Sequence, residues 1–119
     1  MRRIWFKAKC LSDGSWVAGN FCHRATGDYI IVGECRFAID PETVCQLTGM
    51  EDVGGNEVWE KDIVISSFED NGIEKEYEVV YVVKNGAFAF KSLDDGEIYY
   101  GVDSFAIIGN KFDRKEGEG

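Results

Sequence analysis

The sequence predicts an all-β protein, built as a barrel or a small sandwich. Three observations carry this prediction: short segments alternate apolar and polar residues, turn signals separate them at even spacing, and the chain has a single proline. The 119 residues, 45% of them hydrophobic, match the size of one domain and are too apolar for a disordered chain. The longest apolar run, Val79–Val83, is far shorter than the roughly 20 residues of a membrane-spanning helix.

The first third of the chain predicts strands joined by tight turns. Residues 3–9 alternate with period two, which is typical of a half-buried strand. Turn clusters follow at Ser12–Ser15 and Thr26–Asp28. Gly33 interrupts the next apolar stretch and is interpreted as a β-bulge. The expected strands are Arg3–Lys9, Trp16–Cys22, Tyr29–Val32 and Cys35–Ile39.

A short helical turn is expected after these strands. Asp40 is a candidate N-cap, and Pro41 suits the first helical position. The β-branched residues that follow, and the stop at Gly49, leave room for at most one turn before a short strand.

The second half predicts a meander of antiparallel strands. Turn signals lie at Val53–Asn56, Asp70–Gly72, Asn85–Gly86 and Asp94–Gly96. Asn85 and Gly86 both tolerate a positive φ, so they predict a two-residue hairpin turn after a strand covered on both faces. The expected strands are Glu57–Trp59, Ile63–Phe68, Tyr77–Val83, Ala87–Lys91, Glu97–Tyr100 and Ala106–Gly109, with a polar tail after them.

The net charge of −9 is unevenly distributed. Residues 1–50 hold six basic and five acidic side chains, whereas residues 51–119 hold seven basic and 17 acidic ones, a net charge of 7 − 17 = −10. An acidic half of this kind opposes direct binding to nucleic acid, which depends on neutralising phosphates. Lys7 and Lys9 interrupt the start of any apolar signal-peptide core, so we expect a cytoplasmic protein with no membrane association.

The cysteines and the single histidine indicate neither a metal site nor a redox site. Cys10, Cys22, Cys35 and Cys45 form no Cys-x-x-Cys pair, so we expect free, reduced thiols. Cys22 and His23 are neighbours on a strand and point to opposite faces. A nucleophilic pair of His23 with one of the other three cysteines stays open.

Four carboxylates have two interpretations. Asp52, Glu57, Glu60 and Asp62 can form an acid–base or divalent-metal group, or the two aspartates can accept backbone N–H bonds in turns. We favour the turn role and expect no cofactor and no metal.

Residues 41–50 read PETVCQLTGM and residues 56–64 read NEVWEKDIV. The chain opens with RIWFKA at residues 3–8 and closes with IIGNKF at residues 107–112. In this order, these stretches resemble the motifs of the YopX family of phage and prophage proteins. Two positions depart from the family pattern, since Cys45 and Lys61 stand where glycine is usual. If that second glycine has a positive φ, either Lys61 is strained or the turn has shifted.

The resemblance implies a fold and a bacterial host but does not imply a reaction, so no catalytic residue is carried over. It implies an N-terminal β-layer over residues 1–50, an SH3-like barrel over 51–112 and a polar tail over 113–119. The motif residues are Pro41, Glu42, Thr43, Val44, Gln46, Leu47, Thr48, Gly49, Trp59, Asp62, Gly109 and Asn110.

Three functions stay open. The first is a non-enzymatic module that self-associates through the edge strands of its sheets. The second is an acidic regulator that binds a basic phage or host protein or imitates DNA. The third is a carboxylate- or metal-dependent hydrolase. For residues 40–64 we expect a structural role at the junction of the two parts, against the competing idea that Glu42, Gln46 and Asp62 converge on a ligand.

Overall fold

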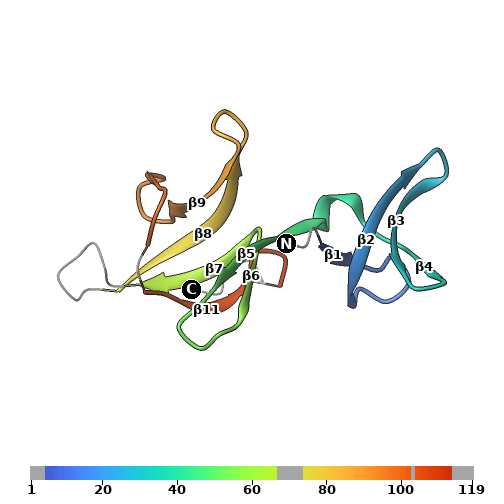
Figure 1. Cartoon of the computed structure of the whole chain (residues 1–119), viewed down its shortest axis with the longest axis horizontal. Coiled ribbons are helices and arrows are strands. Elements are labelled where there is room, and N and C mark those ends of the chain that lie inside the picture. The colour runs from blue at the N-terminus through green and yellow to red at the C-terminus, as the bar shows by residue number, and fades with distance from the viewer. Residues whose placement is uncertain (1–4, 67–73, 103, 114–119) are drawn as a thin grey trace. The chain divides into compact units, whose positions relative to one another are not determined.

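The computed structural model describes residues 5–66, 74–102 and 104–113, and these residues are mainly β (Figure 1). The strands form two antiparallel sheets, so the predicted all-β class is confirmed. The chain divides into two compact units, residues 1–47 and residues 48–119. Within the described residues, no helix is long and apolar enough to cross a membrane.

The N-terminal unit is a meander of antiparallel hairpins. Its strands are β1 (Phe6–Lys9), β2 (Trp16–Arg24), β3 (Gly27–Val32) and β4 (Cys35–Ala38). Ala8, Ile30 and Ile39 are buried together as its core. An isolated bridge between Cys10 and Ile39 sets the end of β4 beside the end of β1.

Strand β2 changes partner at Gly19. Its first residues, Trp16 to Gly19, pair with β1, and the residues from Asn20 onward pair with β3. A Cβ atom at Gly19 would lie 2.3 Å from the backbone oxygen of Ile31, which only glycine avoids.

Two turns of this unit differ from the sequence prediction. Gly33 is no bulge: with φ +60° it forms, together with Glu34, the two-residue loop of the hairpin that Val32 and Cys35 close. Strand β2 continues to Arg24 and β3 begins at Gly27, so the preceding turn lies earlier than the expected Thr26–Asp28. Both hairpins are tighter than the sequence pattern predicts.

The expected helical turn is confirmed as a 3₁₀ helix, η1 (Pro41–Thr43), with Asp40 as its N-cap. Strand β5 (Cys45–Glu51) follows it and runs across the division between the units. In the six-stranded sheet the order is β4-β3-β2-β1-β5-β6, with β6 at Glu57–Trp59.

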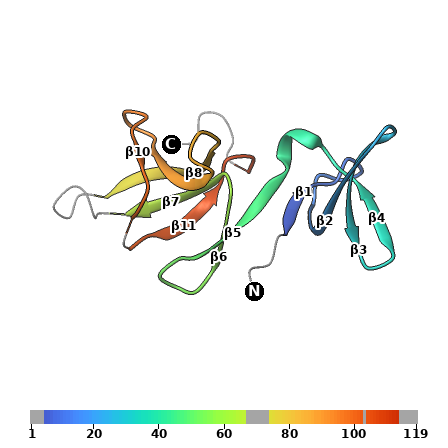
Figure 2. The same ribbon diagram turned by 45° about the horizontal axis from the view of Figure 1, so that its top comes forward.

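The C-terminal unit contains a five-stranded sheet of order β10-β9-β8-β7-β11. Figure 2 shows β7, β8 and β11 lying side by side. Its core joins aromatic and branched side chains, with Tyr77, Val79 and Phe90 at the centre. The strands are β7 (Asp62–Ser66), β8 (Lys75–Val82), β9 (Ala87–Ser92), β10 (Ile98–Tyr99) and β11 (Ala106–Asn110).

This sheet is open, so the expected SH3-like barrel is not confirmed. β10 and β11 are its edges, and each pairs with a single strand of the described sheet. Closure would need a ladder between the edges, and β10 is only two residues long. The turn expected at Asp70–Gly72 and all of the tail after Asp113 lie outside the described residues.

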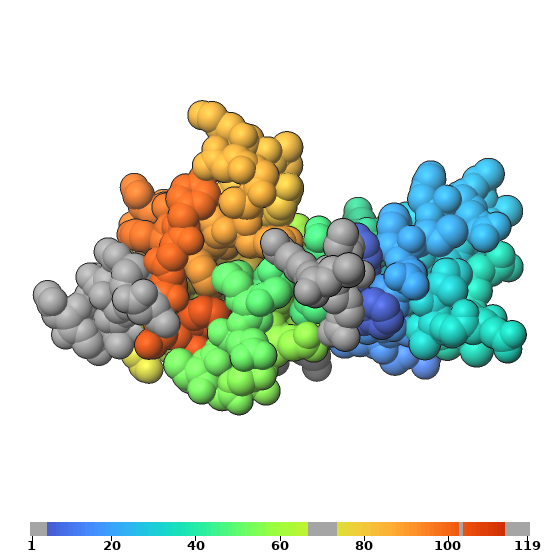
Figure 3. Space-filling view, viewed as in Figure 1, coloured from blue at the N-terminus to red at the C-terminus, as the bar shows by residue number. Residues whose placement is uncertain are grey.

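In the β8–β9 hairpin the positive φ expected at Gly86 is confirmed, but the expected two-residue turn is wrong. Val82 pairs with Ala87, which leaves a four-residue loop in which Gly86 alone has a positive φ, +64°. The expectation that both faces are covered is wrong at this end, because Tyr81 is 42% exposed. The loop projects from its unit in the space-filling view, in the segment coloured gold (Figure 3).

Candidate functional site

The first motif residues lie in η1, where side chains hydrogen-bond to the backbone of the same short segment. The Asp40 carboxylate accepts a hydrogen bond from Glu42 N at 3.0 Å. The buried hydroxyl of Thr43 donates to Asp40 O at 2.7 Å and accepts from Lys9 N at 2.8 Å. Thr43 thereby holds η1 against β1, while Pro41 and Glu42 are exposed.

The next motif residues belong to strand β5. Leu47 is 5% exposed, and Val44 packs against the N-terminal core, while Gln46 pairs with Phe6. Thr48 donates from its buried hydroxyl to Val58 O at 2.7 Å, which connects β5 to β6. Gly49 has φ +85°, a conformation that favours glycine.

Asp62, with Asn110, joins the start of β7 to the end of β11. Asp62 is 3% exposed; its Oδ2 accepts from Trp59 N at 2.9 Å, and its Oδ1 accepts from Asn110 Nδ2 at 3.1 Å. Gly109 lies opposite Ile63 at a register shift in the same ladder. Both carboxylate oxygens of Asp62 therefore serve the fold.

Lys61 is the one described residue other than glycine with a positive φ, +72°. Of the two alternatives left open by the sequence, the structure shows the strained backbone. Lys61 N donates to Val79 O at 2.6 Å, and Lys61 O accepts from Lys111 N at 2.9 Å. These two backbone bonds fix the residue in the left-handed region.

Asp52 links the β5–β6 turn to β11. Its carboxylate accepts from the backbone N–H groups of Gly54, Asn56 and Ile107 at 2.9, 2.9 and 3.1 Å. These bonds, led by that from Asn56, lower the pKa of Asp52 from 3.8 to about 2.

The four carboxylates that suggested acid–base or metal chemistry do not converge in the described residues. The carboxylates of Asp52 and Asp62 accept hydrogen bonds from the backbone at turns and strand ends. Glu57 is exposed, and Glu60 Oε2 lies 4.0 Å from Lys61 Nζ. Across residues 5–66, 74–102 and 104–113, no three His, Cys, Asp or Glu side chains are grouped to hold a metal ion.

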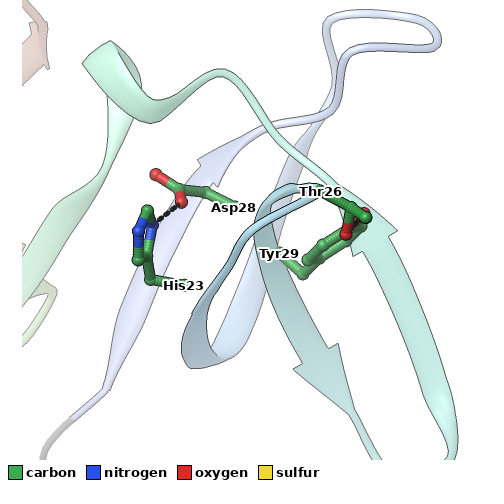
Figure 4. A network of polar contacts seen from close by, with 4 residues as sticks. All are labelled: His23, Thr26, Asp28 and Tyr29. Atoms are coloured by element: carbon green, nitrogen blue, oxygen red, sulfur yellow. Dashed lines mark hydrogen bonds and ion pairs between the residues drawn. The ribbon is translucent and has the colours of Figure 1, made fainter.

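His23 pairs with a carboxylate that sequence reasoning missed. Its Nδ1 is hydrogen-bonded to Asp28 Oδ1 (Figure 4). The four cysteines form no disulfide. His23 and Asp28 face each other across the β2–β3 ladder. A hairpin with its turn at Ala25–Thr26 predicts the pair, whereas the turn signal in the sequence is at Thr26–Asp28.

A pocket of about 340 Å³ lies beside this pair in the N-terminal unit. Its walls are mostly small and apolar, and His23 and Asp28 bring ionisable side chains to it from the same face of the sheet. The lining residues are Leu11, His23, Thr26, Gly27, Asp28, Tyr29, Ala38, Ile39 and Pro41.

Three aromatic residues outside the core of the C-terminal unit lie on or are joined to the β8–β9 hairpin, and we call them the aromatic cluster: Tyr81, Phe88 and Tyr100. The Tyr81 and Phe88 rings meet edge to face, with centroids 5.1 Å apart. Asn85 Nδ2 donates to the Tyr100 hydroxyl at 2.6 Å, so the hairpin loop connects to Tyr100. Tyr81 and Tyr100 are 42% and 54% exposed.

The fold and these contacts define a small all-β protein whose motif residues mainly build turns and strand junctions. The family model of the YopX protein matches residues 9–116, nearly the whole chain, and the chain belongs to this family. This membership suggests a phage or prophage protein. Among curated proteins, none matches the chain.

Proposed function

We propose that this protein is a non-enzymatic, cytoplasmic interaction module that self-associates. The observation that carries the proposal is the aromatic cluster of Tyr81, Phe88 and Tyr100. Tyrosine is enriched in protein interfaces because its ring is apolar and its hydroxyl tolerates water. The cluster extends the core of its unit into solvent, since Tyr81 continues the strand face of Tyr77 and Val79.

The two edges of the five-stranded sheet are less suited to the edge-strand pairing that the sequence-based hypothesis invoked. β10 has two residues, and the Ile107 N–H on β11 is taken by Asp52. An edge that is short or already hydrogen-bonded is poorly suited to pairing with another chain. We therefore place self-association on the aromatic cluster.

Light scattering after size exclusion tests this proposal over a range of concentration and salt. The wild-type mass should exceed that of a monomer and rise with salt, because salt screens the repulsion between acidic units while leaving apolar contacts intact. Tyr100→Ser should shift the protein toward monomer. The matched control is Val53→Ser, which removes a 70% exposed apolar side chain outside the cluster. A monomer at every concentration, or equal masses for the two variants, would contradict self-association at this surface.

A second function, binding to a basic phage or host protein, is favoured by the −10 carried by residues 51–119. Such a complex depends on opposite charges and must weaken with salt, whereas the aromatic association must not. Capture of a basic partner at low salt, lost at high salt, supports this function; capture that is insensitive to salt argues against it.

A further inference from the structure

The pocket of the N-terminal unit has apolar walls and one carboxylate. Leu11, Ile39 and Pro41 contribute aliphatic surface, and Asp28 contributes the negative charge. At about 340 Å³, the pocket is near the lower end of the size range of small-ligand sites. It is suited to one side chain or one small molecule.

Asp28 is held in a fixed orientation but keeps an acceptor. Its side chain is 14% exposed, and its Oδ1 is bonded to His23 Nδ1. A carboxylate accepts hydrogen bonds, so the imidazole Nδ1–H is the donor in this pair. No hydrogen bond from the described residues reaches Oδ2, and Figure 4 shows this oxygen turned away from the ring.

The basic side chains of this region do not neutralise Asp28. Arg36 stacks on the Tyr29 ring, 4.7 Å from its centroid. Strand alternation places Tyr29 and Arg24 on the sheet face opposite to Asp28 and His23. The carboxylate therefore faces an apolar cavity, and His23 is the one described side chain that is hydrogen-bonded to it.

We propose that this pocket binds an alkyl ammonium or alkyl guanidinium group. The alkyl stem packs against Leu11, Ile39 and Pro41, and the cationic head donates to Asp28 Oδ2. An anion is disfavoured by the carboxylate, and His23 with Asp28 supplies too few ligands for a metal ion. This site is in the other unit from the aromatic cluster and does not depend on self-association.

The single histidine makes the test direct, because its imidazole NMR signals need no separation from others. We would titrate the full-length protein at fixed pH with N-acetyl-lysine methylamide and with butylguanidinium. The matched control ligand is N-acetyl-norleucine methylamide, which lacks the ammonium. The cationic probes should shift the His23 signals in a saturable manner, and the norleucine probe should bind on the order of tenfold more weakly or not at all.

Two substitutions that each remove one negative charge test where the ligand binds. Asp28→Asn keeps the shape and removes the charge, and it should weaken binding about tenfold or more. Glu34→Gln, at an exposed turn residue of the same unit, should not change binding. Leu11→Ser alters a wall residue that is 66% exposed, so it should fold normally and weaken binding severalfold.

The outcomes separate the sources of the ligand. Equal affinity for the free probes and for a peptide with an internal lysine supports a small-molecule amine site. Tighter binding of the peptide supports a lysine or arginine side chain of a partner protein. The proposal is overturned if cationic and norleucine probes act alike, or if both Leu11→Ser and Asp28→Asn bind like Glu34→Gln.

Discussion

At position 61 we expect glycine to give a more stable protein than alanine, the reverse of the usual order. Its φ of +72° places a Cβ atom where L-residues are strained by about 1–2 kcal/mol. Glycine has no such strain but loses more chain entropy on folding, about 0.5–1 kcal/mol relative to alanine. Lys61→Gly should therefore be more stable than Lys61→Ala by roughly 0.5–1 kcal/mol.

The comparison with alanine, not with lysine, isolates the backbone. Lys61 Nζ lies 5.6 Å from the Phe112 ring centroid and 4.0 Å from Glu60 Oε2, and both variants lose these contacts equally. The backbone bonds to Val79 and Lys111 survive in both. The difference between the two variants therefore reports the backbone alone: the strain of a positive φ in alanine, less the larger chain entropy that glycine loses on folding.

Lys84 supplies the matched control, since it is exposed, lies in a loop and has no positive φ. There, Lys84→Ala should be as stable as Lys84→Gly or more so. Urea unfolding of the four variants, followed by tryptophan fluorescence, measures both differences. If glycine is no better than alanine at position 61, the strained backbone is not a property of the folded protein.

Four other predictions follow from the structure. Leu47→Ala, at a nearly buried side chain, should lower the free energy of unfolding in urea by about 2–4 kcal/mol, whereas the exposed Glu42→Ala should change neither stability nor association; loss of association in Glu42→Ala would contradict a structural role. Gly86→Val should cost about 1–2 kcal/mol because φ is +64°, and an unchanged Tm would place the strained turn elsewhere. Asp52 has a depressed pKa, so its stabilisation is complete above about pH 4 and is lost as pH falls toward about 2. Urea titrations should show a smaller loss of stability over this range in Asp52→Asn than in the wild type, because Asp13 and Asp95 keep their own lowered pKa values in both proteins. All four cysteines should react with a thiol reagent after denaturation without reductant, and finding two or fewer would overturn the predicted reduced state.

Local chemistry made most of the strands predictable. Proline at position 41, the cap at Asp40 and the glycines at turns act over a few residues, so the sequence locates η1 and most strands within two residues. Gly33 shows the limit of this reasoning. A bulge and a two-residue hairpin both use a glycine between apolar residues, and only the pairing of Val32 with Cys35 separates them.

The candidate site was less predictable because it depends on register. A turn placed two residues late puts His23 and Asp28 out of reach of each other, although both residues are conspicuous in the sequence. Sheet closure depends on contacts still farther apart in the chain. Asp52 bonds to Ile107 across 55 residues, and a period-two pattern carries no information about such a contact.

The charge distribution explains why the composition of the whole chain does not predict a cation-binding pocket in the N-terminal unit. The net charge is −9, and the excess of acidic residues lies in residues 51–119. Judged by charge alone, a cation would be expected to bind that half of the chain. Yet a surface carboxylate surrounded by water contributes little to binding, and a single half-buried one beside apolar walls contributes more because fewer waters compete for it. Asp28, in the nearly neutral N-terminal unit, meets that condition, and solvation rather than charge count makes it the better candidate for recognising a cation.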